Sequence, residues 1–286
     1  MAINGILVTN ITQSDAKYQA QHDEFISKAK LIPDLTLTEV KNQYTVEYLH
    51  HHQIDFILFW DKDIYLARKL SNLGYKVFNN PEAIYLCDDK ALTANALETA
   101  SVPTPDYYVL PFAFQQNIMN FYDEYKHELY KLGFPLVMKE RFGSFGDQVH
   151  LITDENHLKV FLQEHGHKQL IAQRFLSKHQ GTDYRVNVVG DEVILTVERS
   201  NAHDFRSNIN QGGSATFVAA TKKMKQVAIA ATKAVNAHFA GVDIMVDDND
   251  NLTVLEVNSN MRTVAVNTVS DIDLTTAILE YIVRSI

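Results

Sequence analysis

Short apolar runs and segments with helical spacing alternate over residues 1–85. The run IDFILFW is apolar at almost every position, which is typical of a strand buried on both faces. Gly74 follows a segment with helical spacing, where a glycine commonly ends a helix. Strands that alternate with helices predict a small parallel α/β domain. We expect strands at residues 3–9, 54–60 and 75–78, and helices at 15–30 and 63–73.

From residue 86 onward, longer helical segments are separated by strand-like runs. The stretch SVPTPDYYVL contains two closely spaced prolines, so it must be extended. The run FPLVMKERFGSFGDQVHLI has the pattern of a strand, a glycine loop and a second strand. We expect helices at 88–100, 115–132, 156–164, 222–239 and 274–283, and further strands at 169–175, 183–189, 192–199, 241–246 and 252–258.

The composition narrows the classes of protein to which the chain can belong. It has 286 residues, 46% of them hydrophobic, and a formal charge of −9 at pH 7; this permits a sizeable core and argues against a nucleic-acid partner. The single cysteine, Cys87, excludes a disulfide within the chain and is typical of a reducing compartment. No signal-peptide pattern begins the sequence, and no apolar run approaches the ~20 residues of a membrane span. We expect a cytoplasmic protein without a membrane partner.

The first candidate for chemistry is Lys139 followed by the loop Gly143-Ser144-Phe145-Gly146. Glycine leaves room for backbone N–H groups to approach phosphate oxygens, and a lysine supplies a positive charge for the same phosphates. The loop is not a Walker A motif, and it does not open a helix as a dinucleotide fingerprint does. On these residues alone, a β-hairpin with a glycine turn is the favoured alternative.

The second candidate is a set of oxygen-bearing side chains, Asp243, Glu256 and Asn258. Glu256 and Asn258 are two positions apart on a predicted strand, so they share one face. A hairpin that pairs Asp247 with Leu252 also places Asp243 opposite Glu256, and residues directly opposed across two strands point to the same side.

The chemistry of this set favours a magnesium site. Carboxylate and amide oxygens suit Mg²⁺, which commonly bridges protein and phosphates in enzymes that use ATP. The alternative is the solvent-facing side of an antiparallel pair. Against that alternative, we expect the opposite face of the hairpin to be apolar, with Val242, Ile244, Leu255 and Val257.

The third candidate lies in ERSNAHDFRSNINQGG, which contains Arg199, Arg206 and Asn208 ahead of a glycine pair. Arginines and an amide at such a position indicate an anion site. For this segment alone, a charged surface loop is the favoured alternative.

The order of these pieces resembles the ATP-grasp superfamily and, within it, the RimK/LysX-like carboxylate–amine ligases. The resemblance covers about residues 78–260. It implies an ATP-grasp fold of two α+β subdomains over residues 86–286, with a hinge near 173–176, behind a parallel α/β pre-ATP-grasp domain over residues 1–85. The segments that carry it are NNPEAIYLCDDKALTANAL, VPTPDYYVL, FPLVMKERFGSFGDQVHLI, AQRFLSKHQGTDYRVNVVGDEV, ERSNAHDFRSNINQGG, and GVDIMV followed by LEVNSN.

The resemblance also implies roles for individual residues. The lysines and the glycine loop match phosphate-binding positions, the hinge matches the backbone that contacts adenine, and the acidic hairpin matches the ligands of Mg²⁺, with Mn²⁺ as an alternative metal. The implied ATP-binding residues are Lys90, Lys139, Gly143, Ser144, Phe145, Gly146, Gln173, Arg174, Phe175, Leu176, Asp183 (near the ribose), Arg206 and Asn208; Arg199, Arg206 and Asn208 are the implied catalytic residues, and Asp243, Glu256 and Asn258 the metal ligands.

The implied reaction joins a carboxylate to an amine through an acyl phosphate at the expense of ATP. The substrates are small molecules, with an amino acid or a short peptide as the expected class. A D-Ala-D-Ala-type ligase, a ligase acting on a cofactor tail and an ATP-binding regulatory protein with degenerate catalysis stay open as alternatives. The resemblance leaves the oligomeric state, including a homo-oligomer, undecided.

The sequence departs from the family pattern at a few positions. Arg174 stands where many relatives have glutamate at the hinge, and Glu140 stands where proline often follows the lysine. Asn260-Met261-Arg262 replaces the common continuation of a small residue, proline and glycine. This last segment borders the expected acceptor site, so it bears on the identity of the substrate.

Overall fold

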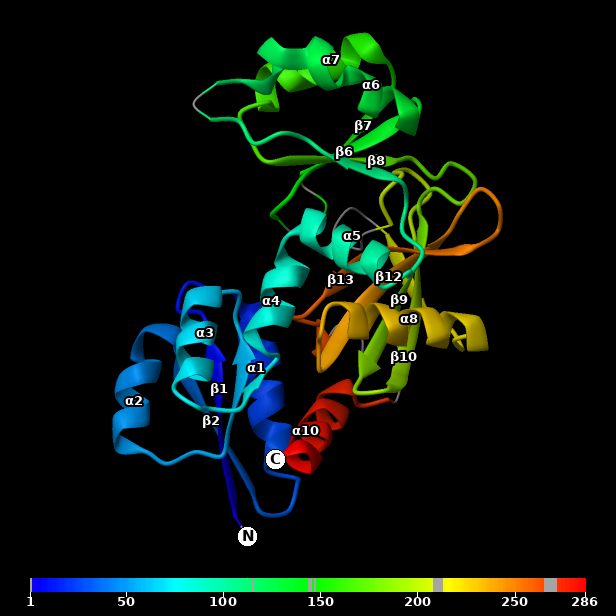
Figure 1. The fold of residues 1–286 in the computed structure, drawn as a ribbon. Coiled ribbons are helices and arrows are strands. Elements are labelled where there is room, and N and C mark those ends of the chain that lie inside the picture. The colour runs from blue at the N-terminus through cyan, green and yellow to red at the C-terminus, as the bar shows by residue number, and fades with distance from the viewer. Residues whose placement is uncertain (1, 115, 144–145, 147, 208–212, 265–271) are drawn as a thin grey trace.

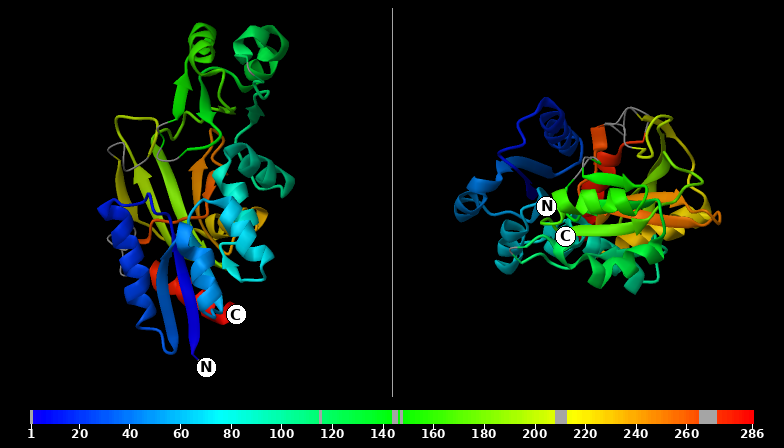
Figure 2. Two further views of the ribbon diagram at one scale, coloured as in Figure 1. Left: turned by 90° about the vertical axis from the view of Figure 1, so that its left-hand side faces the viewer. Right: turned by 90° about the horizontal axis from the view of Figure 1, so that it is seen from above.

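The computed structural model describes residues 2–114, 116–143, 146, 148–207, 213–264 and 272–286. These residues form three sheets (Figure 1). The N-terminal sheet, within residues 3–78, and the C-terminal sheet, within residues 182–258, lie side by side. The central sheet, within residues 107–174, projects beyond them with its helices, as two further views show (Figure 2). This is the α/β and α+β architecture expected from the sequence.

The N-terminal sheet is parallel, with the strand order β2-β1-β3-β4. The expected parallel domain is therefore confirmed. The sequence does not predict β2, because Thr36 and Thr38 face outward from this edge strand and leave no continuous apolar run. The elements are β1 (Ile3–Thr9), α1 (Ala16–Ala29), β2 (Leu35–Lys41), η1 (Asn42–Tyr44), α2 (Thr45–His51), β3 (Phe56–Trp60), α3 (Ile64–Asn72) and β4 (Val77–Phe78).

Two helices lead from the N-terminal sheet to the central sheet. α4 (Pro81–Asp88) begins where Asn80 caps it, with the Asn80 side chain accepting a hydrogen bond from the Ala83 N–H at 2.9 Å. The sequence does not predict this helix, because an Asn-Asn-Pro turn signal is also a helix start. α5 (Lys90–Thr99) confirms the expected helix. The domain boundary expected at residue 85 falls inside α4.

The central sheet is antiparallel, with the order β5-β8-β6-β7. The two strands predicted on either side of the glycine loop are confirmed as β6 and β7. The helix expected at 115–132 begins later, at Tyr122, after a short 3-10 turn. The elements are β5 (Tyr107–Val109), η2 (Ile118–Phe121), α6 (Tyr122–Leu132), β6 (Leu136–Glu140), β7 (Val149–Ile152), α7 (Glu155–His165) and β8 (Leu170–Arg174).

The C-terminal sheet is antiparallel, with the order β11-β10-β9-β12-β13. The helix expected at 222–239 ends at Ala234, because Asn236 adopts a left-handed backbone conformation with φ of 55° and Phe239 already begins a strand. The short strand β11 is also not predicted from the sequence. The elements are β9 (Thr182–Val189), β10 (Glu192–Ser200), β11 (Ser214–Phe217), α8 (Lys222–Ala234), β12 (Phe239–Val246), β13 (Leu252–Asn258) and α10 (Leu274–Ser285).

The β12–β13 hairpin pairs Asp243 with Glu256, as expected, but reaches that pair by another register. Leu252 pairs with Val246, so the loop covers residues 247–251 and the expected pairing of Leu252 with Asp247 is wrong.

A bulge at Leu255 then shifts the register by one residue, because Ile244 pairs with Val254 while Asp243 pairs with Glu256. The bulged Leu255 lines the cavity described below and does not belong to the apolar face, which corrects the expectation for that residue.

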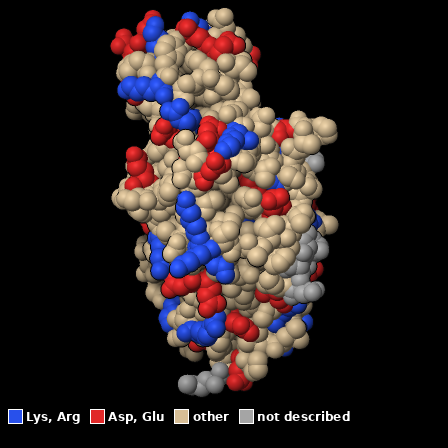
Figure 3. Space-filling model, turned by 90° about the vertical axis from the view of Figure 1, so that its right-hand side faces the viewer, with Lys and Arg blue, Asp and Glu red and all other residues tan. Residues whose placement is uncertain are grey.

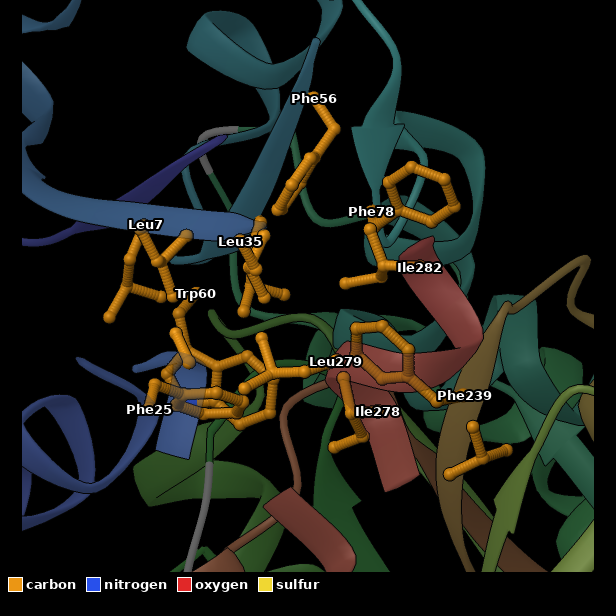
Figure 4. Packing of buried hydrophobic residues seen from close by; sticks show 14 of the residues in the cluster. Leu7, Phe25, Leu35, Phe56, Trp60, Phe78, Phe239, Ile278, Leu279 and Ile282 are labelled. Atoms are coloured by element: carbon orange, nitrogen blue, oxygen red, sulfur yellow. The ribbon is translucent and has the colours of Figure 1, made fainter. Parts of the chain in front are cut away.

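A hydrophobic core joins the N-terminal and C-terminal sheets through α10 (Figure 4). Phe25 of α1 meets Trp60 of β3 edge-on, with ring centroids 4.6 Å apart, and Phe239 of β12 stacks on Trp60 at 5.9 Å. Ile278 and Leu279 of α10 are fully buried against them. Each such side chain stabilises the fold by roughly 1.5–3 kcal/mol, so this core fixes the N-terminal domain against the C-terminal sheet.

One face of the molecule carries side chains of both charges. On the face shown in Figure 3, acidic and basic side chains lie next to one another, whereas a nucleic-acid-binding face is usually basic throughout. Within the described ranges, no helix has both the length and the apolar character that crossing a bilayer requires.

Candidate functional site

A cavity of about 480 Å³ lies where the three sheets meet. Gln13 and Trp60 line it from the N-terminal domain, Lys139 from the central sheet, and Asp243 and Glu256 from the C-terminal sheet. This volume is typical of a site for a small organic ligand.

Most residues singled out in the sequence lie around this cavity. Ser144, Phe145 and Asn208 are outside the described residues. The remaining ones, which come from segments far apart in the chain, are all on the cavity wall: Lys90, Lys139, Gly143, Gly146, Gln173, Arg174, Phe175, Leu176, Asp183, Arg199, Arg206, Asp243, Glu256 and Asn258.

The two lysines reach the cavity from adjacent elements. Lys90 begins α5, whose N-cap Asp89 is held by a bidentate ion pair with Arg141. Lys139 lies on β6, and its ammonium group donates a hydrogen bond to the side chain of Gln173. Loss of hydration, together with the charge of the nearby Lys90, lowers the pKa of Lys139 to about 8, although the carboxylates of Glu256 and Asp243 oppose this shift. Two ammonium groups this close to each other favour a ligand with several negative charges.

The glycine loop is held by cations in this structure. Gly143 and Gly146 have φ angles of 122° and 80°, which are costly for any residue with a Cβ atom. Lys90 Nζ donates to the Gly143 carbonyl at 2.9 Å, and Arg206 Nη1 donates to the Gly146 carbonyl at 2.7 Å. The cations expected to contact phosphate therefore lie next to the loop expected to cover it.

The expected hinge is the connection between two sheets. β8 of the central sheet ends at Arg174, and β9 of the C-terminal sheet begins at Thr182. Arg174 Nε donates to Asp106 Oδ2 at 2.9 Å, and Arg174 Nη2 donates to the Lys131 carbonyl at 3.3 Å. These bonds hold the side chain of Arg174, the residue that stands where many relatives have glutamate.

A chain of ion pairs crosses three neighbouring strands beside the cavity. Arg199 Nε donates to Asp183 Oδ1 at 2.7 Å, and Arg199 Nη2 lies 3.0 Å from Asp243 Oδ1. Arg185 Nη2 donates to Asp243 Oδ2 at 2.8 Å. Burial opposes ionisation of Asp243, but Arg185 and Arg199 outweigh it and hold the pKa of its carboxyl below the ordinary value. Asp243 is therefore an anion, the form in which a carboxyl group binds a metal ion.

The donor set of the expected metal site fits magnesium. Asp243 and Glu256 are cross-strand partners, and Asn258 Nδ2 lies 3.4 Å from Asp243 Oδ2. The set offers two carboxylates and one amide, which are oxygen ligands of the kind that Mg²⁺ prefers. No cluster of three His, Cys, Asp or Glu side chains suited to a metal occurs among the described residues, so the amide is essential to this assignment.

Some residues of the cavity wall are not predicted from the sequence. Arg185 had a usable signal, because Asp183, Arg185 and Asn187 alternate along a strand whose other positions are mostly apolar. Gln13 and Tyr18 had none, because no motif surrounds them and only the packing of the N-terminal domain brings them to the cavity wall.

Comparison with known proteins gives matches over most of the chain. Residues 87–282 match the model of the RimK-like ATP-grasp domain. The chain is 32% identical over 212 residues to "Uncharacterized protein MG012" of Mycoplasma genitalium, covering 72% of each chain. It is 30% identical over 225 residues to the Haemophilus ducreyi protein named "Probable alpha-L-glutamate ligase", covering 77% of this chain and 68% of the relative.

Solved structures share the fold. D-alanine–D-alanine ligase from Bacillus anthracis complexed with ATP superposes with a TM-score of 0.74 at 17% identity, covering 99% of this chain and 96% of that chain. The ATP-grasp ligase PsnB, complexed with a phosphomimetic variant of a minimal precursor, Mg and ADP, superposes with a TM-score of 0.70 at 14% identity, covering 99% of each chain.

Proposed function

The chain belongs to the RimK-like ATP-grasp family and is an ATP-dependent carboxylate–amine ligase; we propose that it forms an amide or peptide bond through an acyl phosphate. The observation that carries this proposal is the single cavity that gathers two lysines, a glycine loop, arginines and an acidic hairpin from two sheets. Each of these features alone has an ordinary structural explanation, but their convergence does not.

ATP binding is the first part of the proposal. Val137, Met245 and Leu255 give one part of the cavity an apolar wall beside the hinge, which suits an adenine ring between the backbone of residues 173–176 and these side chains. The phosphates would lie between Lys90, Lys139 and the loop 143–146. Arg206 would exchange the Gly146 carbonyl for a phosphate oxygen, a stronger charge-assisted hydrogen bond.

The metal is the second part. Asp243, Glu256 and Asn258 would hold Mg²⁺, and Mn²⁺ is compatible with the same oxygen ligands. Bound there, the ion would neutralise charge on the phosphates and on the transferred phosphoryl group. Arg185 and Arg199 keep Asp243 ionised, and Arg199 also links it to Asp183, so Arg199 is proposed to position this ligand.

The reaction then needs no nucleophilic side chain. A carboxylate oxygen of one substrate attacks the γ-phosphorus of ATP, and ADP leaves. The amine of the second substrate attacks the carbonyl carbon of the acyl phosphate, phosphate leaves, and the nitrogen loses a proton. The task of Lys90, Lys139, Arg206 and Asn208 is to bind and orient the groups that carry the developing negative charge.

The substrate class that we propose is an amino acid or a short peptide, with glutamate as the first amine to test because of the name of the Haemophilus ducreyi relative. The likeness to D-alanine–D-alanine ligase, at 17% identity, is one of fold. A degenerate ATP-binding protein is disfavoured because both lysines and all three proposed metal ligands are present.

Release of phosphate from ATP tests the proposal. The purified protein is incubated with MgATP and paired pools of amino acids and other small carboxylates and amines. We expect release that requires one carboxylate and one amine together. Release that is independent of both would show an ATPase, and no release with any pair would contradict the proposed function.

A further inference from the structure

A buried carboxylate lies directly before Lys90 at the start of α5. Asp89 is 1% exposed, and its side chain caps the helix by accepting hydrogen bonds from the Ala91 and Leu92 N–H groups at 2.9 and 3.4 Å. The same carboxylate is paired with the guanidinium group of Arg141, whose Nε donates at 3.0 Å and whose Nη2 donates as well. Because a buried carboxylate is costly without a cation, Asp89 depends on Arg141.

Arg141 belongs to the central sheet and leads into the glycine loop. It follows β6 directly, and its N–H group donates to the Gln169 carbonyl at 2.9 Å, which continues the pairing of β6 with β8 by one residue. Gly143, the first residue of the loop, lies two positions further along the chain. The ion pair with Asp89 therefore joins the start of α5 to the place where β6 ends and the loop begins.

Lys90 is bound to this same place at both of its ends. Its backbone N–H group donates to the Arg141 carbonyl at 2.9 Å, and its ammonium group donates to the Gly143 carbonyl, also at 2.9 Å. Lys90 also lines the cavity. The position of its ammonium group therefore depends on how the start of α5 is held against residues 141–143.

The apolar contacts of α5 are divided between two sheets. Leu97, near the end of the helix, belongs to the core of the C-terminal sheet, whereas Ala91 and Ala94, near its start, share a small apolar cluster with Ile171 of the central sheet. Alanine side chains bury little apolar area and so contribute little stabilisation. The polar bonds to Arg141 are therefore the main link between the start of α5 and the central sheet.

The neighbouring Lys139 makes such a link useful. The charge of Lys90 contributes to the lowered pKa of Lys139, so the two ammonium groups are close enough to repel each other. A lysine side chain is also flexible. A fixed backbone at Lys90 keeps both charges together before a ligand arrives, which lowers the cost of ordering the site when the ligand binds.

We propose that Asp89 and Arg141 are positioning residues for ATP: their ion pair holds Lys90 at the start of the glycine loop, where its ammonium group meets the phosphates. Among the described residues, the cavity wall includes neither Asp89 nor Arg141, so the pair acts through Lys90 and not by touching the nucleotide. This inference rests on the proposed function, because it takes the phosphates to lie between the two lysines and the loop.

Calorimetric titration of the protein with MgATP, without the other substrates, tests the role of the pair. Arg141→Gln should weaken binding by about tenfold, the effect of losing one charge-assisted hydrogen bond to the phosphates. Arg141→Lys keeps the charge and should recover part of the affinity. Lys168→Gln is the matched control, because Lys168 pairs with Glu140 beside Arg141 without joining α5, and it should bind as the unchanged protein does.

A second variant shows through which residue the pair acts. Lys90→Gln by itself should weaken MgATP binding by roughly 10- to 100-fold. Adding Arg141→Gln to Lys90→Gln should cause little further loss, because no ammonium group is left to position. A purely structural role of Arg141 would instead give losses that multiply, as independent changes do.

A third variant covers the case in which Arg141→Gln does not fold because Asp89 has lost its cation. The pair variant Asp89→Asn/Arg141→Gln then replaces it, since asparagine keeps the helix cap and carries no charge that needs a partner. The same tenfold loss, and the same dependence on Lys90, are expected of this variant.

Two results would overturn the inference. The first is MgATP binding by Arg141→Gln, or by the pair variant, that equals binding by Lys168→Gln. The second is losses from Lys90→Gln and Arg141→Gln that multiply in the double variant. Both results require that the unchanged protein binds MgATP. If it does not, the proposed function fails and this inference fails with it, so the two failures can be told apart.

Discussion

Glu256 differs from the neighbouring Asp243 in its hydrogen bonding. Asp243 is bound by Arg185 and Arg199, whereas no described residue donates a hydrogen bond to the Glu256 carboxylate. A carboxylate that faces a cavity without a protein donor is available for a metal.

Changing Glu256→Gln should therefore separate catalysis from stability. The side chain keeps its shape, so the melting temperature should change little, while phosphate release should fall by roughly 100-fold or more because the metal supplies several kcal/mol of charge stabilisation. Glu192→Gln, at an exposed position that begins β10, is the matched control. A folded Glu256→Gln protein with unchanged turnover would remove the metal site.

Lys139 makes nucleotide binding sensitive to pH. Its pKa of about 8 before binding means that the ammonium group loses its proton as the pH rises through 8. Phosphates favour the charged form, so MgATP binding should raise this pKa, take up a proton above pH 8 and weaken by up to about tenfold per pH unit there. Calorimetry in buffers of different ionisation enthalpy measures the uptake. Lys139→Arg should bind without it, and equal uptake in that variant would assign the proton elsewhere.

Among the contacts between elements, one buried amide, the side chain of Asn79, helps to hold the segment that follows β13 in place. Asn79 donates to the carbonyls of Phe239 and Ser259 and accepts from the N–H groups of His238 and Phe239. These bonds tie the end of the N-terminal sheet to the start of β12 and to Ser259, which directly follows β13.

Asn79→Ala should destabilise the protein by about 3 kcal/mol or more, since it leaves several buried polar groups without partners. Asn80→Ala removes only a helix cap and a bond to the Asn236 carbonyl at a more exposed site, and should cost about 1 kcal/mol. Urea unfolding of both variants measures the difference. Equal losses would show that the Asn79 bonds do not hold the segment.

Most elements could be predicted from the sequence because their apolar patterns are regular, as in the fully buried β3. The failures have physical causes: β2 is an edge strand with outward threonines, and α8 is ended by a left-handed Asn236 that helical spacing does not reveal. The pair of Asp243 with Glu256 was predicted through a wrong loop and a missed bulge, two register errors of one residue that cancel.

In the molecule as a whole, the proposed site is formed by segments that lie far apart in the sequence. Lys139 with the glycine loop and the acidic hairpin could be singled out because each lies in a local motif, whereas Lys90 and the hinge were expected only from the resemblance to the family. Gln13 and Tyr18 could not, because only the core around Trp60 and α10 brings the N-terminal domain to the cavity.

A cavity enclosed by three sheets should be stabilised as a unit by its ligand. MgATP at ~100 times its dissociation constant should add about 2.7 kcal/mol to the free energy of unfolding. Thermal unfolding with MgATP, compared with Mg²⁺ alone, measures this. An unchanged melting temperature at millimolar MgATP would contradict nucleotide binding in this cavity.

If ATP activates a carboxylate, an oxygen atom of that carboxylate must pass to phosphate, and an isotope label can follow it. Amino acids carrying ¹⁸O in their carboxyl groups are incubated with the protein, an amine and MgATP, and the released phosphate is analysed by mass spectrometry. An acyl phosphate passes one carboxylate oxygen to the phosphate, so we expect one phosphate carrying a single ¹⁸O atom for each bond formed. Unlabelled phosphate released alongside the amide product would contradict it.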